Sequence, residues 1–310
     1  IQSILLDGHF VIEHTARHRS GRFFNFNGTA GMWRRRCLEE AGGWQADTLT
    51  EDLDLSYRAQ LAGWRFVYLK DVAVPAELPV EMDGFKSQQY RWTKGSIETA
   101  RKLLPRVLTS RFPARVKWEA FFHLSNNLSH LLVVALALLM VPAIVIRDRI
   151  GWTRLVALDF PLFFGASLSF LAFYAASQRE IGRDWRASLR YLPILLSFGI
   201  GLSLSNVRGV VEALVGRRSG FDRTPKYSIE GTTGEWRRKK YRAEGPLSVA
   251  GEIVFALYFL IALAFAVREG YWASVPFLLI FANGFGATAM LSLKSRRERR
   301  PLIRVATAPT

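Results

Sequence analysis

The uneven distribution of hydrophobic residues constrains the fold of this chain more than any other feature. The first 115 residues are mixed and charged, whereas several long apolar runs occupy residues 131–285. Apolar runs of about 20 residues are long enough to cross a hydrocarbon core about 30 Å thick. The sequence therefore predicts a soluble head over residues 1–115 and a membrane region over residues 116–292.

Five apolar segments are candidates to cross the membrane, at about 120–146, 155–177, 189–207, 247–267 and 271–292. Nine Lys or Arg residues lie in 211–246 and six in the tail 293–310, and such basic stretches favour the cytoplasmic side. If the head is cytoplasmic too, only two of the first three segments can cross. Ser197, Gly199 and Asn206 dilute the third segment. We therefore expect four spans, an interfacial or re-entrant helix over about 189–215, a cytoplasmic loop over 216–246 and a cytoplasmic tail.

The head has the local pattern of an α/β domain. Helices are expected over Asp7–His18 and Arg34–Glu40, and from Thr50 to Leu61, where Gly63 ends the helix. The alternating run Arg65–Leu69 and the following Val72–Pro75 predict two short strands. Helices and strands in close succession indicate the α/β class, followed here by an all-α membrane region.

Thr50-Glu51-Asp52 opens one of these helices. In one interpretation, Thr50 caps the helix and the two acids interact with its dipole. In the other, the Asp52 carboxylate is a general base that takes a proton from an attacking hydroxyl group.

Gln88, Arg91 and Trp92 have the spacing that brings side chains to one face of a helix. They could form an amphipathic surface beside the membrane. Alternatively, Arg91 supplies a fixed charge for a diphosphate, Gln88 a neutral donor, and Trp92 a flat face for a sugar ring.

Together, and followed by membrane segments, the two motifs resemble those of the processive family 2 glycosyltransferases, which include cellulose, mannan, chitin and hyaluronan synthases. The matching stretches are Phe26-Asn27-Gly28-Thr29-Ala30-Gly31, Gly42-Gly43-Trp44, Thr50-Glu51-Asp52-Leu53-Asp54-Leu55, Gly63-Trp64, and Gln88 to Ser96. Phe221-Asp222-Arg223-Thr224-Pro225-Lys226 is similar to the gating loop of cellulose synthases, although Arg223 replaces a valine.

This resemblance implies the second half of a GT-A fold and a role for each matching residue. Asp52 would be the catalytic base, with Thr50 and Glu51 shaping its helix end. Gln88 and Arg91 would hold the donor diphosphate, and Trp92 would stack near the acceptor. Gly28 and Thr29 would border the acceptor site, and the gating residues would be Phe221, Thr224 and Lys226.

The resemblance also implies partners and a cofactor. The donor would be a UDP- or GDP-hexose carrying glucose or mannose, and the acceptor a growing β-linked polysaccharide that is extruded through the plasma (inner) membrane. A Mg²⁺ or Mn²⁺ ion would assist. No Asp-x-Asp metal motif precedes Asn25, so we expect the metal ligands and the nucleotide-binding half upstream, and no activity from this chain alone.

Other classes of function remain open on the sequence alone. A non-processive enzyme that glycosylates a lipid carrier, and a non-catalytic scaffold or transporter, both fit the membrane segments. The net charge of +16 does not indicate nucleic acid, because the basic clusters adjoin apolar segments. A polar patch from His123 to His130 lines either a polysaccharide channel entrance or the headgroup zone.

Overall fold

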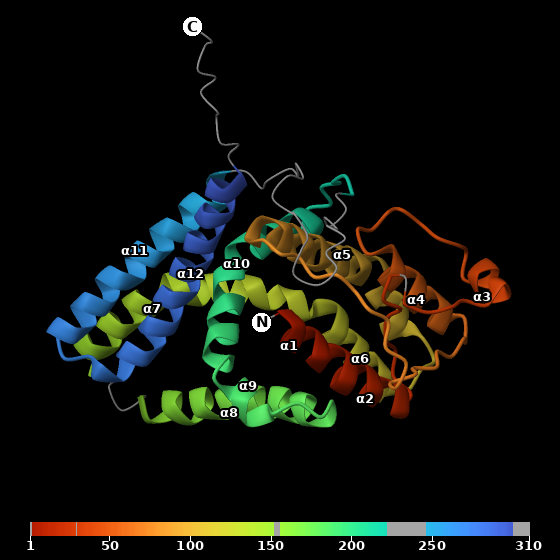
Figure 1. The fold of residues 1–310 in the computed structure, drawn as a ribbon, viewed down its shortest axis with the longest axis horizontal. Helices are drawn as coiled ribbons and strands as arrows, with labels where there is room; N and C mark the ends of the chain where they lie inside the picture. Colours follow the sequence, from red (N-terminus) through yellow and green to blue (C-terminus); the bar gives the residue numbers. More distant parts are fainter. Residues whose placement is uncertain (1, 29, 152–155, 222–245, 300–310) are drawn as a thin grey trace, which may run out of the picture.

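The computed structural model describes residues 2–28, 30–151, 156–221 and 246–299, and over these residues the chain consists of helices and loops (Figure 1). The head contains α1 (Gln2–Asp7), the π-helix η1 (Gly8–His14), α2 (Thr15–Arg19), α3 (Arg35–Glu40), α4 (Glu51–Leu61) and α5 (Met82–Thr109). The remaining helices are α6 (Ala114–Ser125), η2 (Asn126–Leu128), α7 (Ser129–Arg149), α8 (Val156–Glu180), α9 (Trp185–Leu189), α10 (Leu192–Leu214), α11 (Pro246–Arg268), η5 (Trp272–Ser274) and α12 (Val275–Arg299).

The α/β class expected for the head is wrong, since the described residues contain no strand. Both predicted strands, Arg65–Leu69 and Val72–Pro75, lie in a loop between α4 and α5. The side chains of Val67, Val72 and Val74 are exposed, and Val72 N donates only within a local turn, to Leu69 O. Alternation describes where side chains can point, but a strand forms only when its backbone groups pair with a neighbouring strand. Neither segment has such a neighbour among the described residues.

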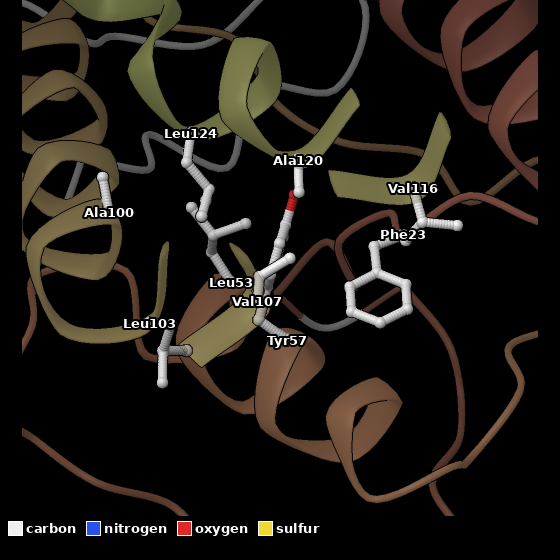
Figure 2. Packing of buried hydrophobic residues seen from close by; sticks show 9 residues of the cluster. All are labelled: Phe23, Leu53, Tyr57, Ala100, Leu103, Val107, Val116, Ala120 and Leu124. Atoms are coloured by element: carbon white, nitrogen blue, oxygen red, sulfur yellow. The ribbon is translucent and has the colours of Figure 1, made fainter. Parts of the chain in front are cut away.

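The core of the head is a helical cluster at the junction with the membrane region (Figure 2). One face of α6 enters this cluster through Val116, Ala120 and Leu124, which pack against Tyr57 of α4 and Leu103 of α5. The burial of these side chains stabilises the junction through removal of apolar surface from water. The helix that leads into the first membrane segment is thereby fixed to both motif-bearing helices.

Among the described residues, five helices are long and apolar enough to cross a membrane, by length and composition: 114–149, 159–180, 185–214, 248–268 and 272–297. The pair α11 and α12 packs against α7 through Phe259, Phe281 and Phe285. Figure 1 shows α10 near the centre of the molecule, where it crosses the direction of α8. Helix α10 is also the most enclosed of the five, because it lies between α5 and α12.

Close approach of α10 and α12 depends on two glycines. A Cβ atom at Gly201 would meet Gly284 O, and one at Gly284 would lie 2.5 Å from Ser197 O. Small residues at such a crossing let two backbones pack closely where there is no water to drive association.

Candidate active site

The two sequence motifs meet where the start of α4 packs against α5. A Cβ atom at Gly95 would lie 2.6 Å from the Thr50 side chain and 2.7 Å from Thr50 N. Thr50 does not cap α4 with its side chain; its hydroxyl group instead lies 3.4 Å from that of Thr99 on α5. Glu98 accepts a hydrogen bond of 2.8 Å from Leu49 N, so α5 holds this segment at both its backbone and its side chains. Thr50 therefore occupies the N-cap position of α4, as one interpretation of the sequence expected, but its side chain contacts α5 and makes no cap hydrogen bond.

The carboxylate of Asp52 is held at the N-terminus of α4 by two backbone donors. Gly28 N donates to Oδ2 at 2.8 Å, and Leu53 N donates to Oδ1 at 2.8 Å. Burial raises the pKa of Asp52 above its ordinary value, the two N–H groups oppose this shift, and the negative charge of Glu51 adds to it. A half-buried carboxylate with a raised pKa and a fixed orientation is suited to accept a proton.

The loop that carries Gly28 is held along α4 by side chains of that helix. Phe26 N donates to Ser56 Oγ at 2.8 Å, and Gln60 exchanges hydrogen bonds with both backbone groups of Phe24. Gly28 has φ +57°, a left-handed conformation that glycine adopts without a steric penalty. The Phe26-Asn27-Gly28 stretch thus brings a backbone donor to Asp52, while Thr29 lies outside the described residues.

Gln88, Arg91 and Trp92 all lie on α5, as their spacing predicted. Burial lowers the pKa of Arg91, and the carboxylates of Glu51 and Asp52 oppose this shift, so the guanidinium group lies near both acids. Gln88 Oε1 accepts a hydrogen bond of 2.6 Å from Gln2 of α1, and Trp92 is 37% exposed. The structure therefore brings a base, a cation and an aromatic surface to one region of the head.

Of the three proposed gating residues, only Phe221 lies within the described residues. The Arg91 guanidinium carbon is 4.6 Å from the centre of the Phe221 ring, which is a cation–π contact. Thr224 and Lys226 fall outside the described ranges. The segment after α10 thus reaches the motif helix at the residue expected to hold the diphosphate.

A charged cluster behind the motif helix was not predicted. The buried Lys94 donates to Glu212 of α10 at 3.0 Å, and Tyr90 OH donates to the same carboxylate at 2.5 Å. Lys94 also donates to Ser219, two residues before Phe221. The sequence shows a basic residue, Lys94, beside Gly95, but its spacing cannot show that positions 94 and 212 meet.

Histidines of the first helices form a second unpredicted network. His14 is fully buried, its Nε2 lies 3.0 Å from His9 Nε2, and His9 Nδ1 is 2.8 Å from Glu13. Burial is the main cause that lowers the pKa of His14 to about 2, so this imidazole is neutral at physiological pH. Asn27 belongs to the loop that carries Gly28, and its Nδ2 lies 3.4 Å from His14 Nε2. This contact connects η1 to the site.

The residues that the structure describes do not fit a divalent metal ion. No group of three or more His, Cys, Asp or Glu side chains among them could hold one. Both Asp52 oxygens accept backbone hydrogen bonds, and Asp54 is paired with Arg58 and Lys102. The carboxylates of Asp52 and Asp54 are therefore both engaged with other groups of the chain.

The polar patch from His123 to His130 is divided between two environments. His123 belongs to the head, where its Nδ1 lies 2.7 Å from Tyr57 OH. His130 faces a cavity in the membrane region and lies 3.1 Å from Asn206 Nδ2 of α10. The patch is not one continuous surface.

Comparison with known proteins identifies the family of this chain. The family model described as glycosyl transferase family group 2 matches residues 6–176, which is more than half of the chain. Glucomannan 4-beta-mannosyltransferase 7 of Arabidopsis thaliana is 36% identical over 165 residues, which are 52% of this chain and 30% of that protein. Probable glucomannan 4-beta-mannosyltransferase 9 of Oryza sativa subsp. japonica is 39% identical over 160 residues, 50% of this chain and 30% of that protein.

The carboxylate, the arginine and the tryptophan of the motifs thus lie in one chain with helices that are apolar enough to cross a membrane. The chain belongs to glycosyl transferase family group 2, as its motifs predicted. It spans about 30% of the length of the curated relatives described above. No solved structure matches it.

Proposed function

We propose that the protein transfers a hexose from a nucleotide sugar to a growing β-linked polysaccharide, with Asp52 as the catalytic base. The observation that carries this proposal is the Asp52 carboxylate, which Gly28 N and Leu53 N orient beside the arginine of α5. The glucomannan mannosyltransferase names of the relatives favour mannose as the hexose and GDP-mannose as the donor.

The reaction is a single displacement that inverts the anomeric carbon. Asp52 takes the proton of an acceptor hydroxyl group, whose oxygen forms the new bond to the anomeric carbon. The bond between that carbon and the diphosphate breaks, and its electron pair leaves with the nucleoside diphosphate. Arg91 and Gln88 would bind the departing diphosphate, since a guanidinium group pairs with phosphate oxygens in a fixed geometry.

Trp92 would lie beside the acceptor sugar, and Phe221 would lie beside the donor. The exposed face of Trp92 is available for a sugar ring, and Phe221 already lies over Arg91. A divalent ion remains a prediction of the resemblance, because the described residues do not hold one.

The proposed arrangement in the plasma membrane has four spans, 120–146, 155–177, 247–267 and 271–292, with head and C-terminus in the cytoplasm. Helix α10 would lie at the cytoplasmic surface, because its buried side carries Ser203, Asn206 and Glu212 and it crosses the direction of α8 (Figure 1). Extrusion of the polymer is part of this proposal and is supported by the family resemblance alone.

The test is polymer synthesis from radiolabelled GDP-mannose by membranes that contain the intact protein. Removal of a general base costs about 10²- to 10⁴-fold in rate, so Asp52→Asn should abolish detectable turnover while donor binding persists. Asp71→Asn, an exposed aspartate of the α4–α5 loop, is the matched control and should be fully active. Full activity of Asp52→Asn would overturn the assignment, and a product with one added sugar would indicate the lipid-carrier reaction instead.

A further inference from the structure

The first helices of the head include a π-helix, which brings together two side chains that an α-helix would separate. The π-helix is η1 (Gly8–His14), and helices of this class form backbone hydrogen bonds between residues five apart. Side chains five apart on an α-helix point about 140° away from each other, whereas a π-helix turns them to the same side. His9 and His14 are five residues apart, and their Nε2 atoms lie 3.0 Å from each other. The π-helix therefore places two imidazoles in contact.

The outer imidazole of this pair, His9, is held by a carboxylate. Its Nδ1 lies 2.8 Å from Oε2 of Glu13, one turn further along the same helix. A carboxylate only accepts hydrogen bonds, so Nδ1 of His9 carries the proton and its Nε2 is directed at His14. The position of the His14 ring is thus fixed from within η1.

Packing alone does not explain a histidine at position 14. Its side chain is fully buried, with ring centroids 5.4 Å from Phe24 and 5.2 Å from Tyr68. Its Nδ1 is buried and has no hydrogen-bond partner among the described residues, which costs free energy that an apolar ring would not cost. The polar atom that does make contacts is Nε2, which faces His9 and Asn27.

The contact between His14 and Asn27 holds for either orientation of the amide. Asn27 Nδ2 lies 3.4 Å from His14 Nε2, and Asn27 Oδ1 accepts a hydrogen bond of 2.8 Å from Asn25. In this orientation the imidazole accepts from the amide nitrogen. As its other tautomer, it would donate to the amide oxygen of a turned side chain. The contact with Asn25 stays within the loop, whereas that with His14 joins the loop to η1.

Asn27 precedes the residue that orients the catalytic carboxylate. Gly28 N donates to Asp52 Oδ2 at 2.8 Å, and Asn27 O accepts from Ala30 N at 3.0 Å in the turn around Gly28. Gly28 is exposed and has no side chain that could anchor it. The position of its N–H group therefore depends on how the preceding residue is held.

We propose that His14 is a positioning residue, which keeps the Gly28 N–H group on the Asp52 carboxylate. It acts through the side chain of Asn27 and does not touch the substrate. The kinetic consequence rests on the proposed function, in which Asp52 is the base, whereas the contact can be tested without sugar transfer.

The first experiment compares variants of the intact protein by their pH profiles of kcat with GDP-mannose. Burial raises the pKa of Asp52, and the hydrogen bond from Gly28 opposes this shift. His14→Phe keeps a ring but loosens that hydrogen bond, so it should raise the pKa of Asp52 and move the acid limb of kcat to higher pH. The value of kcat should fall about ten-fold or more, since a displacement of about 1 Å can cost about 100-fold, while the Kd of the donor stays unchanged.

Two further variants separate positioning from packing. His14→Gln keeps a polar amide near the place of Nε2 and should restore the acid limb to its wild-type position. His18→Phe is the matched control, because it makes the same change on the following helix beside the same Phe24 ring. Its acid limb should also stay in place. The charged groups that face Asp52, Glu51 of α4 and Arg91 of α5, are present in every variant.

The second experiment measures hydrogen exchange of the Gly28 amide by mass spectrometry in detergent. Exchange should be several-fold faster in His14→Phe and Asn27→Leu than in the wild-type protein, His14→Gln and His18→Phe. Wild-type exchange in His14→Phe would overturn the proposal, and so would an acid limb that stays in place. If His14→Phe does not fold, as its elution profile would show, His14→Met carries the same expectations with a more adaptable apolar side chain.

A double variant tests the route through Asn27. If His14 acts through this residue, His14→Phe with Asn27→Leu should lose no more kcat than the weaker of the two single variants, and additive losses would contradict the route. Failure of the proposed function is distinguishable from failure of this inference. Full activity of Asp52→Asn would overturn the function, and the exchange of the Gly28 amide would still report on His14.

Discussion

Gly95 is the residue at which the two motif-bearing helices touch. Its missing side chain lets Thr50 lie against α5, and that contact sets the distance between Asp52 and the Gln88–Trp92 face. The motif residues on either side of it supply the chemistry, but the glycine decides whether they meet. A methyl group at this position would collide with backbone, which cannot rotate away as a side chain can.

We predict that Gly95→Ala in the intact protein will reduce turnover at least ten-fold and destabilise the fold by about 1–3 kcal/mol, as overpacking of a tight contact does. Turnover with GDP-mannose and thermal unfolding in detergent measure the two effects. Gly165→Ala, where a Cβ meets open space on α8, should change neither. Wild-type turnover in Gly95→Ala would show that the helix contact does not position the base.

The protonation of Asp52 gives the second prediction at this scale. Burial and the charge of Glu51 raise its pKa above 3.8, and a base acts only when ionised. Turnover should therefore fall as the pH drops through a value above 3.8, and Glu51→Gln should move this acid limb to lower pH because it removes a negative neighbour. The pH profile of kcat tests this. An acid limb that stays in place or moves upward in Glu51→Gln would contradict the assignment of Asp52 as the titrating base.

At the scale of elements, α5 joins the head to the last two membrane helices through a buried ion pair. Lys86 and Glu252 of α11 are both fully buried, and Lys86 also donates to Ser292 of α12 at 2.7 Å. A buried pair is not by itself a large stabiliser, but removal of one charge leaves the other in an apolar environment. The pair therefore specifies how α5 docks on α11 and α12.

We expect Lys86→Met to destabilise the protein by about 3–5 kcal/mol, and the double change Lys86→Met with Glu252→Leu to recover most of that loss. Thermal unfolding of the purified protein gives both values. Arg35→Met, which removes an exposed partner of Glu39 on α3, should have no measurable effect. If the double variant is as unstable as the single one, the unpaired charge of Glu252 is not the cause of the loss in stability.

At the scale of the whole molecule, the position of α10 decides the topology. By length and composition, five helices of the described part of the chain could cross the membrane. If α10 were one of them, three crossings would separate the head from the segment after α10 and place the two on opposite sides. The contact of Arg91 with Phe221 and that of Lys94 with Ser219 join the head to that segment, so they favour one side for both.

Single cysteines introduced into a Cys37→Ser background should report this arrangement. We expect Asp71→Cys and Arg217→Cys to react with an impermeant maleimide only from the cytoplasmic side, and Glu269→Cys only from the outside. Cys37 is a free cysteine, so its replacement breaks no disulfide bond. Reaction of Arg217→Cys from the outside would establish five spans and overturn the proposed arrangement.

The local signals in the sequence predicted much of this structure. Glycines and helical periodicity located α3 and α4 within about one residue, because a helix makes its hydrogen bonds within one segment. Over their described residues the apolar segments are mainly helical for the same reason. Gln88, Arg91 and Trp92 have the spacing of one helix face, and they lie on α5. The predicted strands failed because pairing of a strand depends on a neighbour that its own residues do not specify.

What the sequence determined by itself is thus the local helices α3 and α4, the apolar segments and the membership of the family. Tertiary structure alone decided the contacts made between residues far apart in the chain. Gly28 reaches Asp52, Lys94 reaches Glu212, and Asn206 meets His130 in an apolar cavity. The physical reason is that periodicity and capping act over a few residues, whereas burial, charge pairing and cavities arise only when distant helices pack together.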